Sequence, residues 1–232
     1  MSVLTLTDVA GGYPGTRVLD GVDLEVDEGR VLVLLGRNGV GKTTLIHTIM
    51  GMLKATGSIR LGERELLGLS THHVARAGLA LVPQGRRVFA PLTVDENLRL
   101  GAARAAKGPW SPAKVYELFP RLAERRKNNA GQLSGGEQEM LSIGRALVTN
   151  PQLLLMDEPS DGLAPSIVKL VGEVVRSLAA EGATVLLVEQ NLHLALKVAD
   201  QVAVMSKGRV VFRGAPDALH DPTRVRDLLG VG

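Results

Sequence analysis

The chain has 232 residues, of which 45% are hydrophobic and 22% are charged, and its formal net charge is +3. This length can bury a substantial core as one large or two modest domains. The absence of cysteine excludes disulfide bonds, zinc–thiolate sites and thiol catalysis. The sequence has no run of about 20 apolar residues that would span a bilayer, and its first residues do not resemble a signal peptide. We therefore expect a cytosolic protein.

Antiparallel strands are expected in the first 30 residues and again at residues 57–61, where turn residues separate short apolar segments. Continuous apolar runs predict buried parallel strands at Val31–Leu35, Leu79–Val82, Leu153–Met156 and Thr184–Val188. A helix after the first run is indicated by Leu45, Ile46, Ile49 and Met50 at helical spacing, with Gly51 at its end. This alternation predicts an α/β fold with a mostly parallel central sheet.

The middle of the chain has a different pattern. Between residues 87 and 150 the strand-like runs disappear, and we expect helices over Val94–Ala106, Ser111–Glu124 and Gly135–Val148. We predict one domain, residues 1–232, with residues 87–150 as an inserted helical subdomain. Near the C-terminus, Gln201–Met205 and Arg209–Phe212 are expected to form a hairpin, which a short helical tail follows.

The densest group of basic residues extends from Arg121 to Lys127 on a predicted helix, and Glu124 interrupts it. A solvated helix face explains such a segment better than a nucleic-acid or lipid-binding patch. Surfaces that bind single strands add aromatic residues on which bases stack, and none lies among these basic residues. We therefore expect no nucleic-acid partner.

A glycine-rich segment after the first buried strand matches the phosphate-loop pattern G-x-x-x-x-G-K-[ST]. The residues that we predict to bind ATP there are Gly36, Arg37, Asn38, Gly39, Val40, Gly41, Lys42, Thr43 and Thr44. Glycines let successive backbone N–H groups face phosphate oxygens, and the following helix adds its positive end. Lys42 can bind the β- and γ-phosphates, and the Thr43 hydroxyl can bind Mg²⁺. A mere glycine-rich turn is the alternative; the spacing does not fit a dinucleotide fold.

Two carboxylates follow the third buried strand, at the sheet edge where ligands of α/β proteins bind. Asp157 suits the role of holding Mg²⁺ through its water shell, and Glu158 is placed to polarise an attacking water. Pro159 is expected to keep Glu158 in extended backbone and so to fix its direction. A solvated turn is the alternative interpretation, but the upstream phosphate loop favours the catalytic one.

A second candidate phosphate site begins the helix expected at residues 135–148. Ser134 fits an N-cap and Glu137 its capping-box partner. Gly135 and Gly136 weaken a first helical turn, so their presence suggests that something approaches the backbone closely. A γ-phosphate at the helix N-terminus would do so; a well-capped helix without a ligand is the alternative.

The phosphate loop, the segment LSGGEQ at residues 133–138 and LLLMDEP at residues 153–159 together resemble an ABC-type ATPase cassette over essentially the full chain. The resemblance implies that two ATP molecules, with Mg²⁺, bind between head-to-tail cassettes, each phosphate loop facing the signature residues 134–137 of the partner. It implies that Tyr13 stacks on adenine, although a loop tyrosine is often only a packing group. It also implies that Gln84 reaches Mg²⁺ and links it to the helical subdomain, as an amide can both bind a metal and donate.

The chain departs from the family pattern at two positions. Gln190 stands where most members have a histidine that contacts the γ-phosphate, and glutamine cannot carry charge or transfer a proton. His193 follows on the next predicted helix and is expected to be a surface residue. Ala164 stands where an aspartate is usual, before Pro165 at a predicted helix start. Because Glu158 is retained, we still expect hydrolysis, and we expect a heterodimer whose second ATPase subunit carries the missing histidine.

Four segments resemble the second, LivF-like ATPase subunit of branched-chain amino acid importers, namely residues 82–89, 92–98, 158–165 and 187–191. Urea and short-chain amide importers share most of this pattern and remain an alternative. The resemblance implies two transmembrane permease subunits as partners, an external substrate-binding protein as an indirect partner, and a peripheral position on the inner face of the cell membrane. Phe89 and residues 92–97 would line the groove for the permease, or would form only subdomain core.

A different functional class is a soluble ABC ATPase of DNA repair or translation. Such proteins usually carry a coiled-coil insertion or two fused cassettes, and this sequence has neither. A nucleotide kinase also uses a phosphate loop, but the motif at Ser134 would have no purpose there. The sequence therefore favours the transporter.

Overall fold

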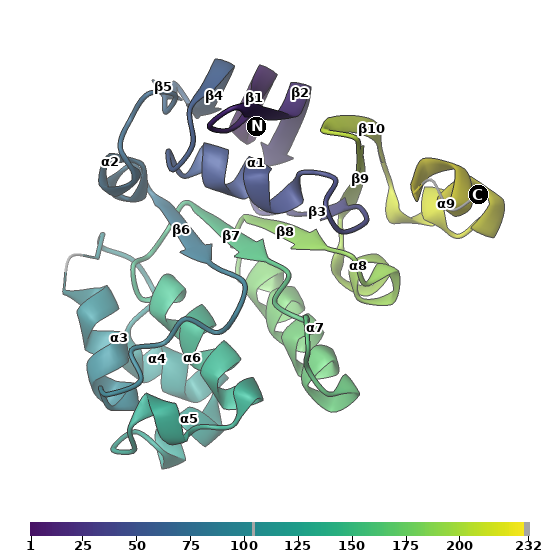
Figure 1. The fold of residues 1–232 in the computed structure, drawn as a ribbon. Coiled ribbons are helices and arrows are strands. Elements are labelled where there is room, and N and C mark those ends of the chain that lie inside the picture. Colours follow the sequence, from purple (N-terminus) through teal and green to yellow (C-terminus); the bar gives the residue numbers. More distant parts are fainter. Residues whose placement is uncertain (104, 230–232) are drawn as a thin grey trace.

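Two sheets of different kinds organise the chain in the computed structural model, which describes residues 1–103 and 105–229 (Figure 1). An antiparallel sheet has the strand order β2-β1-β4-β5, and a second, six-stranded sheet has the order β10-β9-β3-β8-β7-β6. The strands are β1 (Ser2–Tyr13), β2 (Thr16–Asp27), β3 (Val31–Leu35), β4 (Ala55–Leu61), β5 (Arg64–Glu65), β6 (Leu79–Val82), β7 (Leu153–Asp157), β8 (Val185–Glu189), β9 (Gln201–Ser206) and β10 (Arg209–Gly214).

The helices follow the strands in the alternation that the sequence predicts. They are α1 (Lys42–Ile49), α2 (Thr71–Arg76), α3 (Val94–Ala102), α4 (Pro112–Leu118), α5 (Pro120–Glu124), α6 (Gly135–Leu147), α7 (Pro165–Ala180), α8 (Leu192–Val198) and α9 (Pro222–Leu229), with short 3-10 turns at Ala130–Gln132 and Pro216–Leu219. Strands β3, β6, β7, β8 and β9 run parallel, and β10 pairs antiparallel with β9. The predicted α/β fold and C-terminal hairpin are confirmed.

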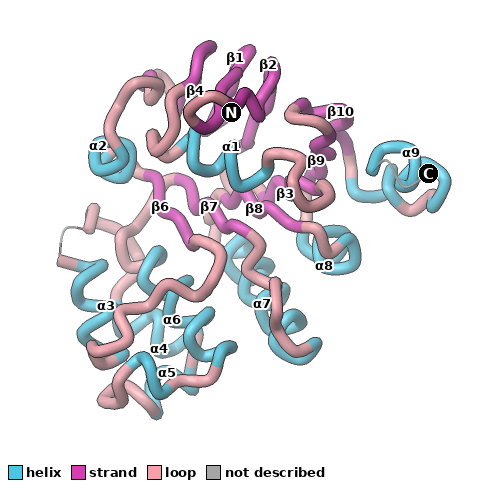
Figure 2. The backbone as a smooth tube through the Cα atoms, in the orientation of Figure 1, coloured by secondary structure: helices cyan, strands magenta, loops and turns pink. Residues whose placement is uncertain are grey.

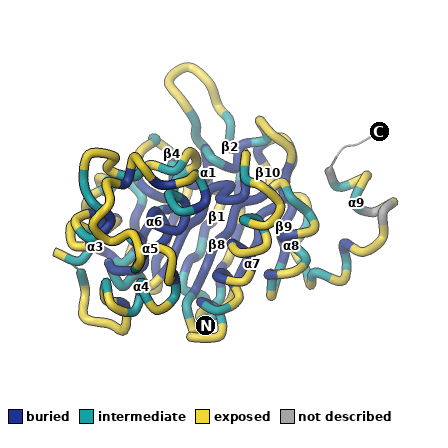
Figure 3. Tube along the Cα trace, turned by 90° about the horizontal axis from the view of Figure 1, so that it is seen from below, coloured by how far each residue is buried: buried dark blue, intermediate teal, exposed yellow. Residues whose placement is uncertain are grey.

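Strand β3 separates two hydrophobic cores, because side chains alternate across a sheet. Leu32 and Leu34 face α1 and the antiparallel sheet, whereas Val31, Val33 and Leu35 face the core formed with α6, α7 and α8. Helix α1 therefore lies between the two sheets (Figure 2). Strands β3, β7 and β8 are buried along their whole length, and exposed residues lie on the surrounding helices and loops and on the outer strand β10 (Figure 3).

Helices α3 to α6 gather beside the end of β6 and form a group apart from α7 and α8 (Figure 1). Val94 and Leu98 of α3 pack with Val115 of α4 and Ile143 of α6 in one apolar cluster. The structure is consistent with a helical unit in this region, and its boundaries at residues 87 and 150 remain a prediction.

Some predicted helix boundaries are wrong. The helix expected over Ser111–Glu124 is two helices, because Phe119 has φ −125° and ψ 76° before Pro120, a conformation that interrupts the first helix. The helix expected to reach Ala106 ends at Ala102. Helix α2 was missed, since it buries only Val74 and so shows little periodicity. Within residues 1–103 and 105–229, no helix has the length and hydrophobicity needed to cross a membrane.

Candidate functional site

The phosphate loop lies between the carboxyl end of β3 and the start of α1, as its sequence predicts. Gly39 and Gly41 have φ values of +80° and +111°, which side chains with a Cβ rarely adopt. A Cβ at Gly36 would lie 2.7 Å from the carbonyl oxygen of Met205. A cavity of about 420 Å³ opens at the loop, and we call it the phosphate-loop cavity. Its lining residues are Tyr13, Val18, Asn38, Gly39, Gly41, Lys42, Thr43, Thr44, Gln84 and Glu158.

Lys42 is buried at the centre of this cavity, with only 4% of its surface exposed. Its ammonium donates to the carbonyl oxygens of Gly36 (2.8 Å) and Arg37 (2.9 Å). It also forms an ion pair of 2.9 Å with Oε1 of Glu158. At an effective dielectric constant of about 20, that attraction is about 6 kcal/mol before the desolvation of both groups is counted. The loop lysine is thus held by protein oxygens at the place where phosphate oxygens would bind.

Thr43, which lines the cavity, and Asp157, which lies behind it, form a pair suited to a divalent cation. The Thr43 hydroxyl donates to Oδ1 of Asp157 at 3.2 Å, and Asp157 is 2% exposed. Burial raises the pKa of Asp157, although the Thr43 hydrogen bond opposes this. Hydroxyl, carboxylate and amide oxygens suit Mg²⁺, which also keeps waters and substrate phosphates as ligands. This donor set fits the ion, even though no cluster of three acidic or histidine ligands occurs among the described residues.

Glu158 adopts a backbone conformation that the sequence did not predict. Its φ is +48°, in the left-handed region, whereas Pro159 was expected to keep it extended. The backbone N–H of Glu158 donates to the carbonyl of Val188 at 3.0 Å, and its carboxylate binds Lys42. These contacts hold a conformation that non-glycine residues adopt at some cost, as is common at active sites.

Gln84 follows β6 and meets the two acidic residues after β7. Its Nε2 donates to Oε2 of Glu158 at 3.4 Å and to Oδ2 of Asp161 at 3.1 Å. The parallel pairing of β6 with β7 brings these loops to one edge of the sheet. The structure therefore places Gln84, Asp157 and Glu158 at one site, as the sequence predicts; their catalytic roles remain predictions.

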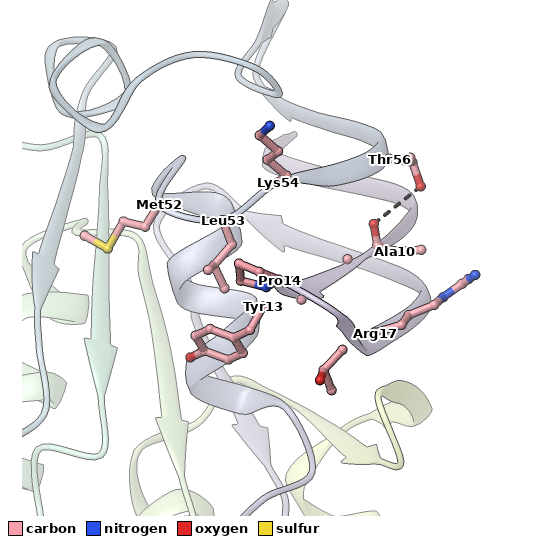
Figure 4. A pocket seen from close by; sticks show the side chains of 11 residues that line it. Ala10, Tyr13, Pro14, Arg17, Met52, Leu53, Lys54 and Thr56 are labelled. Carbon is pink, nitrogen blue, oxygen red and sulfur yellow. Dashed lines mark hydrogen bonds between the residues drawn. The ribbon is translucent and has the colours of Figure 1, made fainter.

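Tyr13 ends β1 at the turn to β2, and 46% of its surface is exposed. It lines both the phosphate-loop cavity and an adjoining cavity of about 690 Å³. In Figure 4 its ring lies beside α1, while Arg17 and Lys54 lie elsewhere along the rim of the adjoining cavity. An exposed aromatic face next to a phosphate site suits stacking on a base. Stacking on adenine remains a prediction that this position allows.

The signature residues begin α6 with the capping box that the sequence predicts. The Glu137 carboxylate accepts the backbone N–H of Ser134 at 2.8 Å, and the Ser134 hydroxyl accepts the N–H of Glu137 at 3.4 Å. The close approach expected at the two glycines is present, but it is made by side chains of the same chain. A Cβ at Gly135 would lie 2.5 Å from Nη1 of Arg86, and one at Gly136 would lie 2.8 Å from Cδ1 of Ile167.

The signature residues are not part of the lining of the phosphate-loop cavity. A phosphate contact of Ser134 and the two glycines therefore requires a second cassette, and it remains a prediction.

Known proteins match the chain over nearly all of its length. A family model described as "ABC transporter" matches residues 19–161. The chain belongs to the ABC transporter family. It is an ATPase of that family, and the resemblance seen in its sequence is confirmed.

The relatives of this ABC ATPase include ATP-binding proteins of transport systems. It is 46% identical over 228 residues to the high-affinity branched-chain amino acid transport ATP-binding protein BraG of Pseudomonas aeruginosa, with 97% of this chain and 98% of BraG covered. It is 34% identical to the probable branched-chain amino acid transport ATP-binding protein LivF of Archaeoglobus fulgidus, with 97% and 98% covered. It is 32% identical to the lipopolysaccharide export system ATP-binding protein LptB of Escherichia coli K12, with 99% and 98% covered.

A solved structure shares the whole fold. The ADP conformation of MJ1267, an ATP-binding cassette of an ABC transporter, has a TM-score of 0.84 at 30% identity, with 100% of this chain and 99% of that chain covered.

The departures of this ABC ATPase from its family pattern lie at the ends of two elements. Gln190 is exposed after β8 and does not line the phosphate-loop cavity in this conformation, so its contact with a γ-phosphate remains a prediction. Ala164 is the N-cap of α7 and Pro165 its first residue. His193 is exposed on α8, as expected.

Two buried carboxylates at the site were missed by the sequence reasoning. Glu189 is fully buried and accepts the N–H groups of Ser160 (3.3 Å), Gln190 (3.2 Å) and Asn191 (3.3 Å), and burial raises its pKa. Its place directly after an apolar strand, as for Asp157, was a signal that could have found it. Glu139 is buried on α6, where its sequence position gives no such signal.

Proposed function

We propose that this chain is the ATP-hydrolysing subunit of an importer of branched-chain amino acids, and that it works with two permease subunits on the cytoplasmic face of the cell membrane. The observation that supports it most is the match to BraG, at 46% identity over 97% of this chain. Several of the groups that we propose for hydrolysis line one cavity, and Asp157 contacts Thr43 of that cavity, which supports the proposal. Lipopolysaccharide export is the second candidate, because LptB proteins match at 32% over a similar length.

The first step in the proposed mechanism is an exchange of partners at Lys42. ATP phosphates take the place of Glu158 at the ammonium, and the N–H groups of the loop and of the α1 N-terminus bind the remaining phosphate oxygens. The exchange releases the Glu158 carboxylate in a buried position. It can then orient a water and accept its proton as the water attacks the γ-phosphate.

Thr43, Asp157 and Gln84 would hold Mg²⁺ at this site. When bound, the ion would neutralise part of the negative charge of the phosphates. Gln84 now donates its amide N–H groups to Glu158 and Asp161, so a turn of its side chain is needed to offer the amide oxygen.

A second ATPase subunit completes the site in this proposal. The N-terminus of α6 with Ser134, Gly135 and Gly136 would bind the γ-phosphate held by the partner's phosphate loop. The exposed Gln190 carries no charge, and this supports a heterodimer in which the second subunit supplies a histidine.

A mild-detergent affinity purification of the full chain from native membranes tests the proposal, with the associated proteins identified by mass. We expect two permeases and a second cassette, and an associated binding protein that binds leucine-like amino acids in preference to urea or short-chain amides. Recovery of lipopolysaccharide-export components would favour the second candidate. Recovery of no membrane protein would overturn the transport role and the heterodimer together.

A further inference from the structure

Glu139 is a buried carboxylate without a complete set of partners. It lies on α6, about one turn after the signature glycines Gly135 and Gly136. Only 3% of its surface is exposed. Its Oε1 is fully buried and accepts no hydrogen bond from any described residue. Buried polar atoms are nearly always paired, because an unpaired one loses its hydration without compensation. An exception beside an active site indicates a partner that arrives in another conformation.

The cavity in front of Glu139 contains one suitable partner. This space, of about 440 Å³, is lined by Gln84, Gly85, Arg86, Glu139, Glu158, Asp161 and Gly162, and we call it the glutamine-loop cavity. Of these lining residues, Arg86 alone carries a positive charge. It lies two positions after Gln84 on the same loop, so a displacement of this loop toward the metal site would also displace Arg86.

Arg86 is held elsewhere in the present conformation. Its Nη2 donates to the carbonyl of Gly162 at 2.8 Å, and its guanidinium covers Gly135, where a Cβ would lie 2.5 Å from Nη1. Its φ is +54°, a conformation that arginine adopts only under restraint. Gly85, between Gln84 and Arg86, has φ +90° and open space where a Cβ would be, so the backbone is unobstructed there. The positive φ of Arg86 costs free energy that a change of the loop conformation could release.

Resting on the proposed function, we infer that Glu139 is a positioning residue that receives Arg86 when nucleotide binds. The movement of Gln84 toward the bound ion carries Arg86 off Gly135 and across the glutamine-loop cavity to the carboxylate of Glu139. The resulting ion pair uncovers the signature backbone for the partner's phosphate and fixes the glutamine loop against α6. Glu139 would thus couple the ATP site of its own chain to the site that it completes in the second cassette.

The negative charges around Glu139 favour the approach of a cation to its carboxylate. Glu158 and Asp161 line the same cavity from the loop after β7, and Glu189 lies on β8. Burial raises the pKa of Glu139 to about 7, Arg86 opposes the increase from its present distance, and Glu189 adds to it. A guanidinium arriving at this carboxylate would therefore relieve both its missing hydrogen bond and its repulsion by Glu189.

A double-mutant cycle on nucleotide affinity tests the pair. The full chain and its Glu139→Gln, Arg86→Gln and doubly substituted variants are titrated with Mg²⁺ and the non-hydrolysable ATP analogue AMP-PNP, and Kd is measured. We expect each single substitution to weaken binding about 5-fold to 10-fold, and the double substitution to weaken it no further, because partners in one interaction are not additive. Glu173→Gln, an exposed carboxylate on α7, is the matched control and should leave Kd unchanged.

Several results would overturn the inference. Additive effects would show that Glu139 and Arg86 act separately, and unchanged Kd values would show that neither matters to nucleotide binding. A loss in Arg86→Gln alone would indicate that Arg86 contacts the nucleotide directly. The proposed function fails by a different result, namely that the unsubstituted chain does not bind AMP-PNP at all. Circular dichroism of Arg86→Gln, a change at a partly exposed side chain, guards against misfolding as the cause.

Discussion

Replacing Glu139 by glutamine should stabilise the folded chain in a pH-dependent way. Burial raises the pKa of this carboxyl from its ordinary value of 4.5 to about 7. The folded chain therefore keeps this proton up to about pH 7, whereas the unfolded chain loses it near pH 4.5, so the fold loses stability between these two pH values. Since each pKa unit corresponds to about 1.4 kcal/mol, the full destabilisation is about 3 kcal/mol. Glutamine has nearly the same shape and does not ionise.

The sign follows from the protonation of the two states. Below pH 4.5 the carboxyl is protonated both folded and unfolded, so it contributes no pH dependence. Between pH 4.5 and 7 the folded chain binds more protons than the unfolded chain, and stability falls as pH rises. Above pH 7 the loss is complete. Between pH 5 and pH 8, the advantage of Glu139→Gln over the unsubstituted chain should therefore grow by about 2 to 3 kcal/mol.

Urea unfolding of the two chains at pH 5, 6, 7 and 8, without nucleotide, measures this difference. The exposed carboxylate of Glu173 supplies the control, because Glu173→Gln should follow the unsubstituted chain at every pH within about 0.5 kcal/mol. A stability difference between Glu139→Gln and the unsubstituted chain that stays constant from pH 5 to pH 8 would refute the reasoning. It would mean that the carboxylate is ionised in the folded state at no cost.

Three further changes test the catalytic assignments. Glu158→Gln should lower the ATP hydrolysis rate at least about 100-fold, because the general base is lost. The rate is measured by phosphate release. MgATP should bind as well or more tightly, because Lys42 loses its competing carboxylate. An unchanged hydrolysis rate would exclude Glu158 as the base. Tyr13→Ala should raise the Kd for ATP about 5-fold through lost stacking, and an unchanged Kd would leave Tyr13 as a surface group. Gln190→His should raise the hydrolysis rate of the isolated chain; a full rate before the change and none gained after it would show that the departure is neutral.

The fold was largely predictable, because apolar runs and glycine patterns report local requirements directly. The buried strand at Val31–Leu35 and the phosphate loop that follows it were placed correctly from such patterns. The break between α4 and α5 could have been read from Pro120, whereas α2 buries too little to leave a periodic signal. Errors of this kind arise where a helix is interrupted or where an element is short and little buried, as α2 is.

The site was predictable only where a motif records it. Short sequence motifs with a known chemical role contain Lys42, Gln84 and Asp157. The left-handed backbone of Glu158 was not predictable, because contacts with Val188 and Lys42 from other strands and loops override the local effect of Pro159. Glu139 and Arg86 line one cavity although they are more than 50 residues apart in the sequence, and no local pattern reports that arrangement.

The burial of α1 between two sheets has a mechanical consequence. Six of its eight residues, from Lys42 to Ile49, are buried, so the helix cannot slide or tilt without disrupting the hydrophobic core between the two sheets. The phosphate loop at the start of α1 is therefore the rigid side of the ATP site. Helices α3 to α6 follow the glutamine loop and form a group apart from α7 and α8 (Figure 1). A displacement of that loop by nucleotide would be passed to this group, and we expect a neighbouring protein to meet it at the exposed side chains of Phe89 and Leu100.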